Sequence, residues 1–107
     1  MELALIQSQL QKPDEGIKLL DKAIELDQQY IHYFYRGRLN YQNKKIGKAI
    51  KDYDKSIELK PDHGASYSWR GIAKYWNARI DEACGDFNKG AELGDEEGKN
   101  MKLKLCK

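Results

Sequence analysis

The residues of this chain that could do covalent or metal chemistry are two cysteines and two histidines. Cys84 and Cys106 lie equally far along the chain from a turn near Asp95, so an antiparallel pair of helices would bring the two thiols level. A disulfide there would indicate an oxidising compartment. Neighbouring helix axes, about 8–10 Å apart, usually hold side chains too far apart for this bond. We therefore favour Cys84 as a small buried hydrophobic residue, with the disulfide as the alternative.

Metal binding and catalysis need side chains at set spacings, and the sequence does not show them. Neither His32 nor His63 has metal-ligand spacing with a cysteine. The chain contains no glycine-rich phosphate loop, no nucleophile elbow, and no histidine or carboxylate pair placed for acid–base work. We predict that the protein is not an enzyme and takes no metal or cofactor, with both histidines at the surface or at helix ends.

The elements that carry these residues follow a 34-residue repeat. The segment from Tyr33 to Leu59 reads YFYRGRLNYQNKKIGKAIKDYDKSIEL, and 34 residues later the segment from Tyr67 to Leu93 reads YSWRGIAKYWNARIDEACGDFNKGAEL. Eleven of the 27 aligned positions are identical. A fixed period of this length is typical of an array of stacked structural repeats.

Each segment between turn signals has a helical period. Apolar residues recur at i, i+3, i+4 and i+7 positions, as in the stretch that starts at Ile46, and no stretch alternates with the period of a strand. Pro13 suits a first helical turn, whereas Pro61 and Gly94 are typical of helix ends. The predicted helices lie near residues 1–11, 14–27, 30–43, 46–59, 64–77, 80–93 and 95–106.

The repeat resembles the tetratricopeptide repeat (TPR) family, whose unit is a helix–turn–helix of 34 residues. The resemblance rests on small and aromatic residues at matching places: Gly37, Ala49, Tyr53 and Ser56, and then Gly71, Ala83, Phe87 and Gly90. It implies an all-α fold, an α-solenoid of about three TPR units plus a C-terminal capping helix. We expect a single domain over residues 1–107, with units at about 1–29, 30–63 and 64–94 and the capping helix at 95–107.

The tail EEGKNMKLKLCK has the pattern expected of a capping helix. Gly98, Met101 and Leu105 fall on one side, where they would cover the last unit, and lysines fill the other side. A repeat array needs a polar outer face at its end, and this helix would supply it.

In TPR arrays the first helices of successive units line a concave groove that holds peptides or partner helices. The resemblance places an aromatic set with one cation in this groove: Phe34, Tyr35, Arg38, Tyr41, Gln42, Trp69, Ile72, Tyr75 and Trp76. Tyrosine, tryptophan and arginine are enriched at binding hot spots. Any one of these aromatic residues could instead fill space between helices. For the whole set we favour a groove that binds a protein or peptide.

TPR domains that bind chaperone tails hold a C-terminal carboxylate with lysine, asparagine and arginine side chains. The matching places in this chain are Met1, Leu5, Tyr35, Ala65 and Trp69. These side chains cannot form the strong hydrogen bonds that a carboxylate requires. An apolar or aromatic-anchored peptide, extended or helical, fits better.

Composition narrows the partners further. Charged residues make up 34% of the chain and its net charge is +2, which is too balanced for binding nucleic acid by bulk attraction. Lys48, Lys51 and Lys55 share one helix face, but acidic residues are interleaved, so we read this face as solvated. No apolar run approaches the roughly 20 residues of a membrane span, and no signal peptide is visible. We slightly favour the cytoplasm.

Two other functions stay open. The chain could be a structural scaffold that forms a homodimer through its N-terminal unit or its groove. It could also be a fragment of a longer TPR scaffold, because its first unit begins part-way through the motif. The partner itself cannot be named, because this fold serves many unrelated processes.

Overall fold

The computed structural model describes residues 13–106 as a stack of helices. These are α2 (Pro13–Leu26), α3 (Tyr30–Gln42), α4 (Ile46–Leu59), α5 (Gly64–Trp76), α6 (Ile80–Glu92) and α7 (Glu96–Leu105). Their ends lie within one residue of the predicted ones, so these helices are confirmed. The predicted helix at 1–11 lies outside the described residues. Within residues 13–106 the structure contains no strand, as expected.

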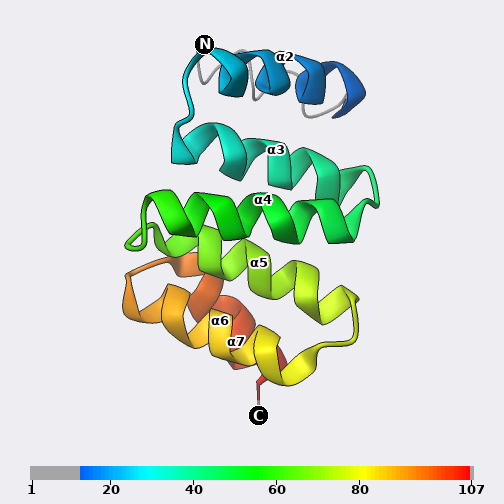
Figure 1. Cartoon of the computed structure of the whole chain (residues 1–107). Helices are drawn as coiled ribbons and strands as arrows, with labels where there is room; N and C mark the ends of the chain where they lie inside the picture. Colours follow the sequence, from blue (N-terminus) through cyan, green and yellow to red (C-terminus); the bar gives the residue numbers. More distant parts are fainter. Residues whose placement is uncertain (1–12, 107) are drawn as a thin grey trace.

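The helices follow one another as layers of a solenoid (Figure 1). The most extensive contacts are those of α3 with α4 and of α5 with α6, which are the two helical pairs of the repeat. α2 packs on α3, and α4 packs on α5, so each pair continues into the next. α7 lies against both α5 and α6 and covers the end of the array. The all-α solenoid with a C-terminal capping helix is therefore confirmed.

The turns within the two helical pairs and the turn before α7 each contain a residue with a left-handed backbone conformation. Lys44 and Ala78 have φ values of 63° and 61°, and Gly94 has 90°. In each turn the next residue donates its N–H back across the helix end, as in the bond from Lys45 to the carbonyl of Asn40 at 2.8 Å. This pattern satisfies carbonyl groups that a helix end leaves free. A glycine such as Gly94 predicts a left-handed turn from the sequence. A lysine or an alanine does not, so the conformations of Lys44 and Ala78 could not be predicted.

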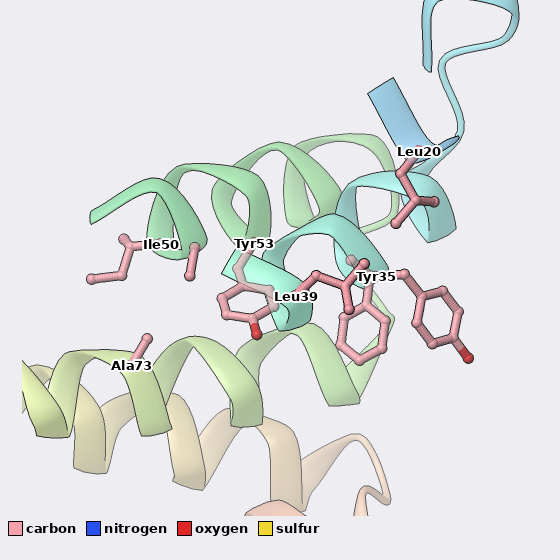
Figure 2. Close-up of a cluster of buried hydrophobic side chains, with 8 residues drawn as sticks. Leu20, Tyr35, Leu39, Ile50, Tyr53 and Ala73 are labelled. Carbon is pink, nitrogen blue, oxygen red and sulfur yellow. The ribbon is translucent and has the colours of Figure 1, made fainter. Parts of the chain in front are cut away.

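Small residues let the paired helices come close. A Cβ atom added to Gly37 would lie 2.7 Å from the ring of Tyr53, and one added to Gly71 would lie 2.7 Å from the ring of Phe87. Both rings are fully buried. Figure 2 shows Tyr53 among the core side chains, with its hydroxyl group directed toward the helix below. The repeated glycine and aromatic residue are thus the two halves of one packing contact.

Ion pairs tie successive helices together on the other side of α3 and α5. Arg36 donates to the carboxylate of Asp52 at 2.7 Å and to that of Asp21 at 2.9 Å. Arg70 repeats this arrangement with Asp86 at 2.8 Å and Asp54 at 2.9 Å. Because each arginine holds one aspartate of its own pair and one of the preceding helix, these contacts link three consecutive helices.

Candidate functional site

A recess of about 420 Å³ lies between the first helices of the two pairs and the capping helix. It is lined by Tyr41 of α3, by Trp69, Ile72, Tyr75 and Trp76 of α5, and by Glu97, Met101 and Leu105 of α7. Most of this lining is apolar or aromatic. Concave sites with an apolar lining and a few polar groups are the usual form of a binding site.

Two further recesses extend this surface along α3. One, of about 310 Å³, is lined by Arg38, Tyr41, Gln42 and Trp69. The other, of about 420 Å³, is lined by Tyr41, Gln42, Lys44, Ile46 and Trp76. All three recesses share Tyr41, so they form one continuous surface. We call it the aromatic groove and define it as Arg38, Tyr41, Gln42, Trp69, Ile72, Tyr75, Trp76, Glu97, Met101 and Leu105.

The rings of the aromatic groove stand edge to face. The ring centroids of Tyr41 and Trp69 are 6.2 Å apart at 73°, and those of Tyr75 and Trp76 are 6.3 Å apart at 87°. This geometry is a favourable one for aromatic pairs. Trp76 is nevertheless 69% exposed, which is unusual for so large an apolar side chain. The rings are therefore held in place by their neighbours while one indole still faces solvent.

Two polar groups of the groove, the guanidinium group of Arg38 and the hydroxyl group of Tyr41, lie beside the apolar faces of these rings. The guanidinium carbon of Arg38 lies 4.4 Å from the ring centroid of Trp69, in the range of a cation–π contact. Burial raises the pKa of the Tyr41 hydroxyl above its usual value of 10.0. A tyrosine hydroxyl keeps its proton at neutral pH, so this group can donate a hydrogen bond to a ligand. A ligand in the groove would meet flat apolar faces with donors beside them.

Two predicted groove residues belong to the core instead. Phe34 and Tyr35 are only 5% and 7% exposed, so they are not free to meet a ligand. Phe34 packs edge-on against the ring of His63, with centroids 4.9 Å apart, and Tyr35 lies in the cluster that contains Leu20. The prediction was wrong for these two because α3 is covered by helices on several sides. Ile72, at 8% exposed, forms part of the groove floor.

The predicted groove did not include the wall that α7 contributes. Met101 and Leu105 pack against the cluster of Ile72 and Phe87, as expected of a capping helix, and their outer edges line the groove with Glu97. The signal was present in the apolar side of the tail. What the pattern could not show is that this helix lies beside the groove rather than away from it.

The structure joins Cys84 of α6 to Cys106 in a disulfide, with the Cα atoms 5.7 Å apart. The interpretation of Cys84 as a free buried thiol does not hold in this structure. The two helices α6 and α7 also approach closely near the turn that joins them, where a Cβ atom on Gly98 would lie 2.9 Å from the backbone nitrogen of Ala91. Cys106 then follows the last residue of α7 with a non-helical backbone and reaches across to α6.

Both histidine side chains lie within hydrogen-bond distance of neighbouring groups of the scaffold. His32 lies with its Nδ1 atom 3.1 Å from the carbonyl oxygen of Asp27. His63 precedes α5, and its Nδ1 atom is 2.7 Å from the hydroxyl of Ser66, which in turn is 2.8 Å from that of Ser56. Over residues 13–106, no group of three or more His, Cys, Asp or Glu side chains could hold a metal ion. No helix of this same stretch is long and apolar enough to cross a membrane.

Comparisons with known proteins agree with the repeat architecture. Two models of the tetratricopeptide repeat match this chain, at residues 1–30 and 33–63. Together they cover 30 and 31 residues, which is more than half of the 107.

Several solved structures have a similar fold. The first TPR of Spaghetti (RPAP3), bound to the HSP90 peptide SRMEEVD, is 23% identical with a TM-score of 0.87, over 95% of this chain and 85% of that one. The Sgt2 TPR domain from Aspergillus fumigatus is 17% identical with a TM-score of 0.88, over 95% and 72%. The first TPR domain of human RPAP3 is 22% identical with a TM-score of 0.84, over 95% and 87%. At these identities the likeness is one of fold.

Proposed function

This chain belongs to the tetratricopeptide repeat family, and we propose that it is a non-enzymatic module that binds a peptide or partner protein through the aromatic groove. One solved relative carries a peptide ligand, which supports an interaction role for a fold of this shape. The proposal includes a single domain over residues 1–107, divided into units at about 1–29, 30–63 and 64–94 with a cap at 95–107.

The observation that carries this proposal is the exposure of Trp76 at the mouth of a concave apolar surface. Trp76 is 69% exposed while the neighbouring Ile72 is 8% exposed. A ligand that covers the indole removes apolar surface from water, and this burial contributes a favourable free energy of about 25 cal/mol per Å². Tryptophan and tyrosine also lose little conformational freedom on binding, and together with arginine they are enriched at measured hot spots.

The chemistry of the groove favours an apolar anchor in the ligand over an acidic chain end. The relative named above holds the peptide SRMEEVD, which ends in acidic and carboxylate groups. Five positions of this chain match, by resemblance, the places that hold a C-terminal carboxylate in TPR domains that bind chaperone tails. Three of them carry the buried Tyr35 and the neutral Ala65 and Trp69. The two others, Met1 and Leu5, lie outside the described residues. Arg38, a cation of the groove, is stacked on an indole, which suits an aliphatic or aromatic side chain packed beside it.

A displayed library of random peptides, selected on the immobilised protein, tests the proposal. Peptides with a shared apolar or aromatic anchor should be enriched, and Trp69→Ala or Trp76→Ala should abolish their retention. Leu103→Ala is the matched control, because this leucine of α7 is about as exposed as Trp76 but does not line the groove. Selection of peptides that Trp69→Ala and Trp76→Ala retain as well as the wild type does would contradict a role for the groove.

A homodimer is the second candidate function, and one surface favours it. Leu26 at the end of α2 is 82% exposed, beside a recess of about 480 Å³. The recess is lined by Leu19, Lys22, Ala23, Leu26, Asp27, Gln29, Ile31 and His32. Light scattering over a range of protein concentrations separates the two functions. A dimer that Leu26→Asp dissociates would favour self-assembly, and a monomer at all concentrations would favour a peptide ligand.

A further inference from the structure

We propose that the disulfide between Cys84 and Cys106 holds the α7 wall of the aromatic groove in place, and that reduction of this bond makes the wall mobile. The importance of the loosened wall for a ligand rests on the proposed function of the groove. The loosening itself does not, because it follows from how α7 is attached. The wall consists of Met101 and Leu105, and Cys106 directly follows Leu105.

The start of α7 is anchored without the disulfide. The side chain of Asp95 accepts a hydrogen bond from the backbone N–H of Gly98 at 3.1 Å. Gly98 is buried at the closest approach of the helices, where a Cβ atom would lie 2.6 Å from the hydroxyl of Ser68. A capped first turn that is packed this tightly does not depend on a bond at the other end of the helix.

The end of α7 has much less to hold it. Gly98 is the one fully buried residue of α7. Met101 and Leu105 are partly buried, and Leu103 between them is 77% exposed. The backbone N–H of Cys106 bonds to the carbonyl of Lys102, which is within α7 itself. At this end of α7, Met101 and Leu105 pack against the cluster of Ile72 and Phe87, and the disulfide is the covalent link to α6.

Breaking this bond is a two-electron reduction. One thiolate of a dithiol reductant attacks the sulfur of one cysteine, and the S–S bond of the protein breaks to give a mixed disulfide. The second thiolate of the reductant then releases the protein. Two electrons and two protons pass to Cys84 and Cys106, which become thiols, and the reductant becomes its own disulfide. Both cysteines are half-buried, so a small dithiol has access to them.

The compartment decides which state is present. Disulfides persist in oxidising compartments and are reduced in the cytosol. The tethered groove would therefore be the form outside the cytosol, and the loosened groove would be the form inside it. A protein moved between the two conditions would change its groove without any change in its repeat scaffold.

Hydrogen–deuterium exchange of the intact protein, with and without dithiothreitol, tests directly whether the disulfide holds the end of α7. Reduction should speed exchange at residues 102–106 by about tenfold or more, while α4 and α5 keep their protection. The Cys84→Ser/Cys106→Ser variant should match the reduced protein and should not respond to dithiothreitol. Unchanged exchange at residues 102–106 would overturn the proposal. So would a loss of protection in every helix, because the bond would then support the whole fold rather than the wall.

A binding measurement separates this proposal from the function of the groove. A peptide obtained from the library selection should bind the oxidised protein more tightly than the reduced one, by about 5-fold to 150-fold, the usual range of coupling between two sites. Equal affinity in the two states would overturn redox control of the groove. If no peptide is selected, the proposed function fails, but the exchange experiment still decides whether the disulfide fastens α7.

Discussion

The guanidinium group of Arg38 lies over the indole of Trp69, with 4.4 Å between the guanidinium carbon and the ring centroid. The two residues come from successive repeat units, so the contact bridges α3 and α5 inside the groove. In the aligned copies Arg38 corresponds to Ile72, which means that the scaffold does not require an arginine here. The contact therefore belongs to the groove rather than to the repeat.

Replacing Arg38 should weaken binding more than folding. Arg38→Ala removes a partly exposed cation–π contact, so the free energy of unfolding should fall by only about 0.5–1 kcal/mol in urea titration. Affinity for a selected peptide should fall by about tenfold or more. Arg79→Ala is the control: this arginine is exposed and pairs with Glu82 outside the groove. A similar affinity for both variants would show that Arg38 is a stabilising residue alone.

The hydroxyl group of Tyr53 gives a prediction about stability. It is fully buried and has no hydrogen-bond partner within residues 13–106, and burial raises its pKa far above the usual value. Its counterpart in the next unit is Phe87, which lacks the oxygen. An unsatisfied buried polar group costs about 1–3 kcal/mol. Tyr53→Phe should therefore raise the free energy of unfolding by about 1 kcal/mol or more, and Phe87→Tyr should lower it. A clear loss of stability in Tyr53→Phe would mean that the hydroxyl has a partner.

The glycine contacts give a matched pair of substitutions. Gly71→Ala places a methyl group 2.7 Å from the ring of Phe87, and overpacking of this kind costs about 1–3 kcal/mol. Gly85→Ala adds a methyl group where nothing lies within 4 Å, and alanine favours the helix by about 1 kcal/mol over glycine. Thermal unfolding should therefore show opposite shifts in melting temperature. Shifts of the same sign would contradict the close approach of α5 and α6.

Stability should depend on pH through His63. Burial lowers the pKa of His63 below its ordinary 6.5, with Lys60 in the same direction and Asp95 and Asp62 opposed to it. The unfolded chain therefore binds a proton more readily than the folded one. The stabilisation is fully present above about pH 6.5 and is lost as the pH falls through that value toward the lowered pKa. Urea unfolding from about pH 7.5 to 5.5 should show this loss, and His63→Gln should remove it. An equal slope in the variant would assign the effect to other groups.

The sequence predicted the helices well because its signals were local. Pro13 opens α2, Gly94 follows α6, and apolar residues with helical period lie between. Distances between helices were less accessible. The approach of α7 to α6 depends on Gly98 meeting the backbone of Ala91, which no single segment reveals. An ordinary interhelical distance is too long for a disulfide, which is why the sequence alone favours a free Cys84.

Seven of the nine predicted groove residues line the recesses, and the two exceptions have a related cause. Periodicity shows which residues share a helix face, but it does not show how much of that face another helix covers. Tyr41 and Trp76 lie toward the ends of their helices and remain accessible, whereas Phe34 and Tyr35 lie near the start of α3 and are covered. Their places in the 34-residue repeat assign all four residues to the groove face. Only the packing of the neighbouring helices separates core from groove.

The measurement that tests the central claim most directly is calorimetric titration of a selected peptide into the wild type, Trp76→Ala and Leu103→Ala. If the aromatic groove is the binding site, Trp76→Ala should raise the Kd by about 30-fold or more, the usual loss at a hot-spot tryptophan. Leu103→Ala, which removes a similarly exposed apolar side chain outside the groove, should leave the Kd unchanged. An unchanged Kd for Trp76→Ala, in a variant that stays folded by circular dichroism, would contradict the account.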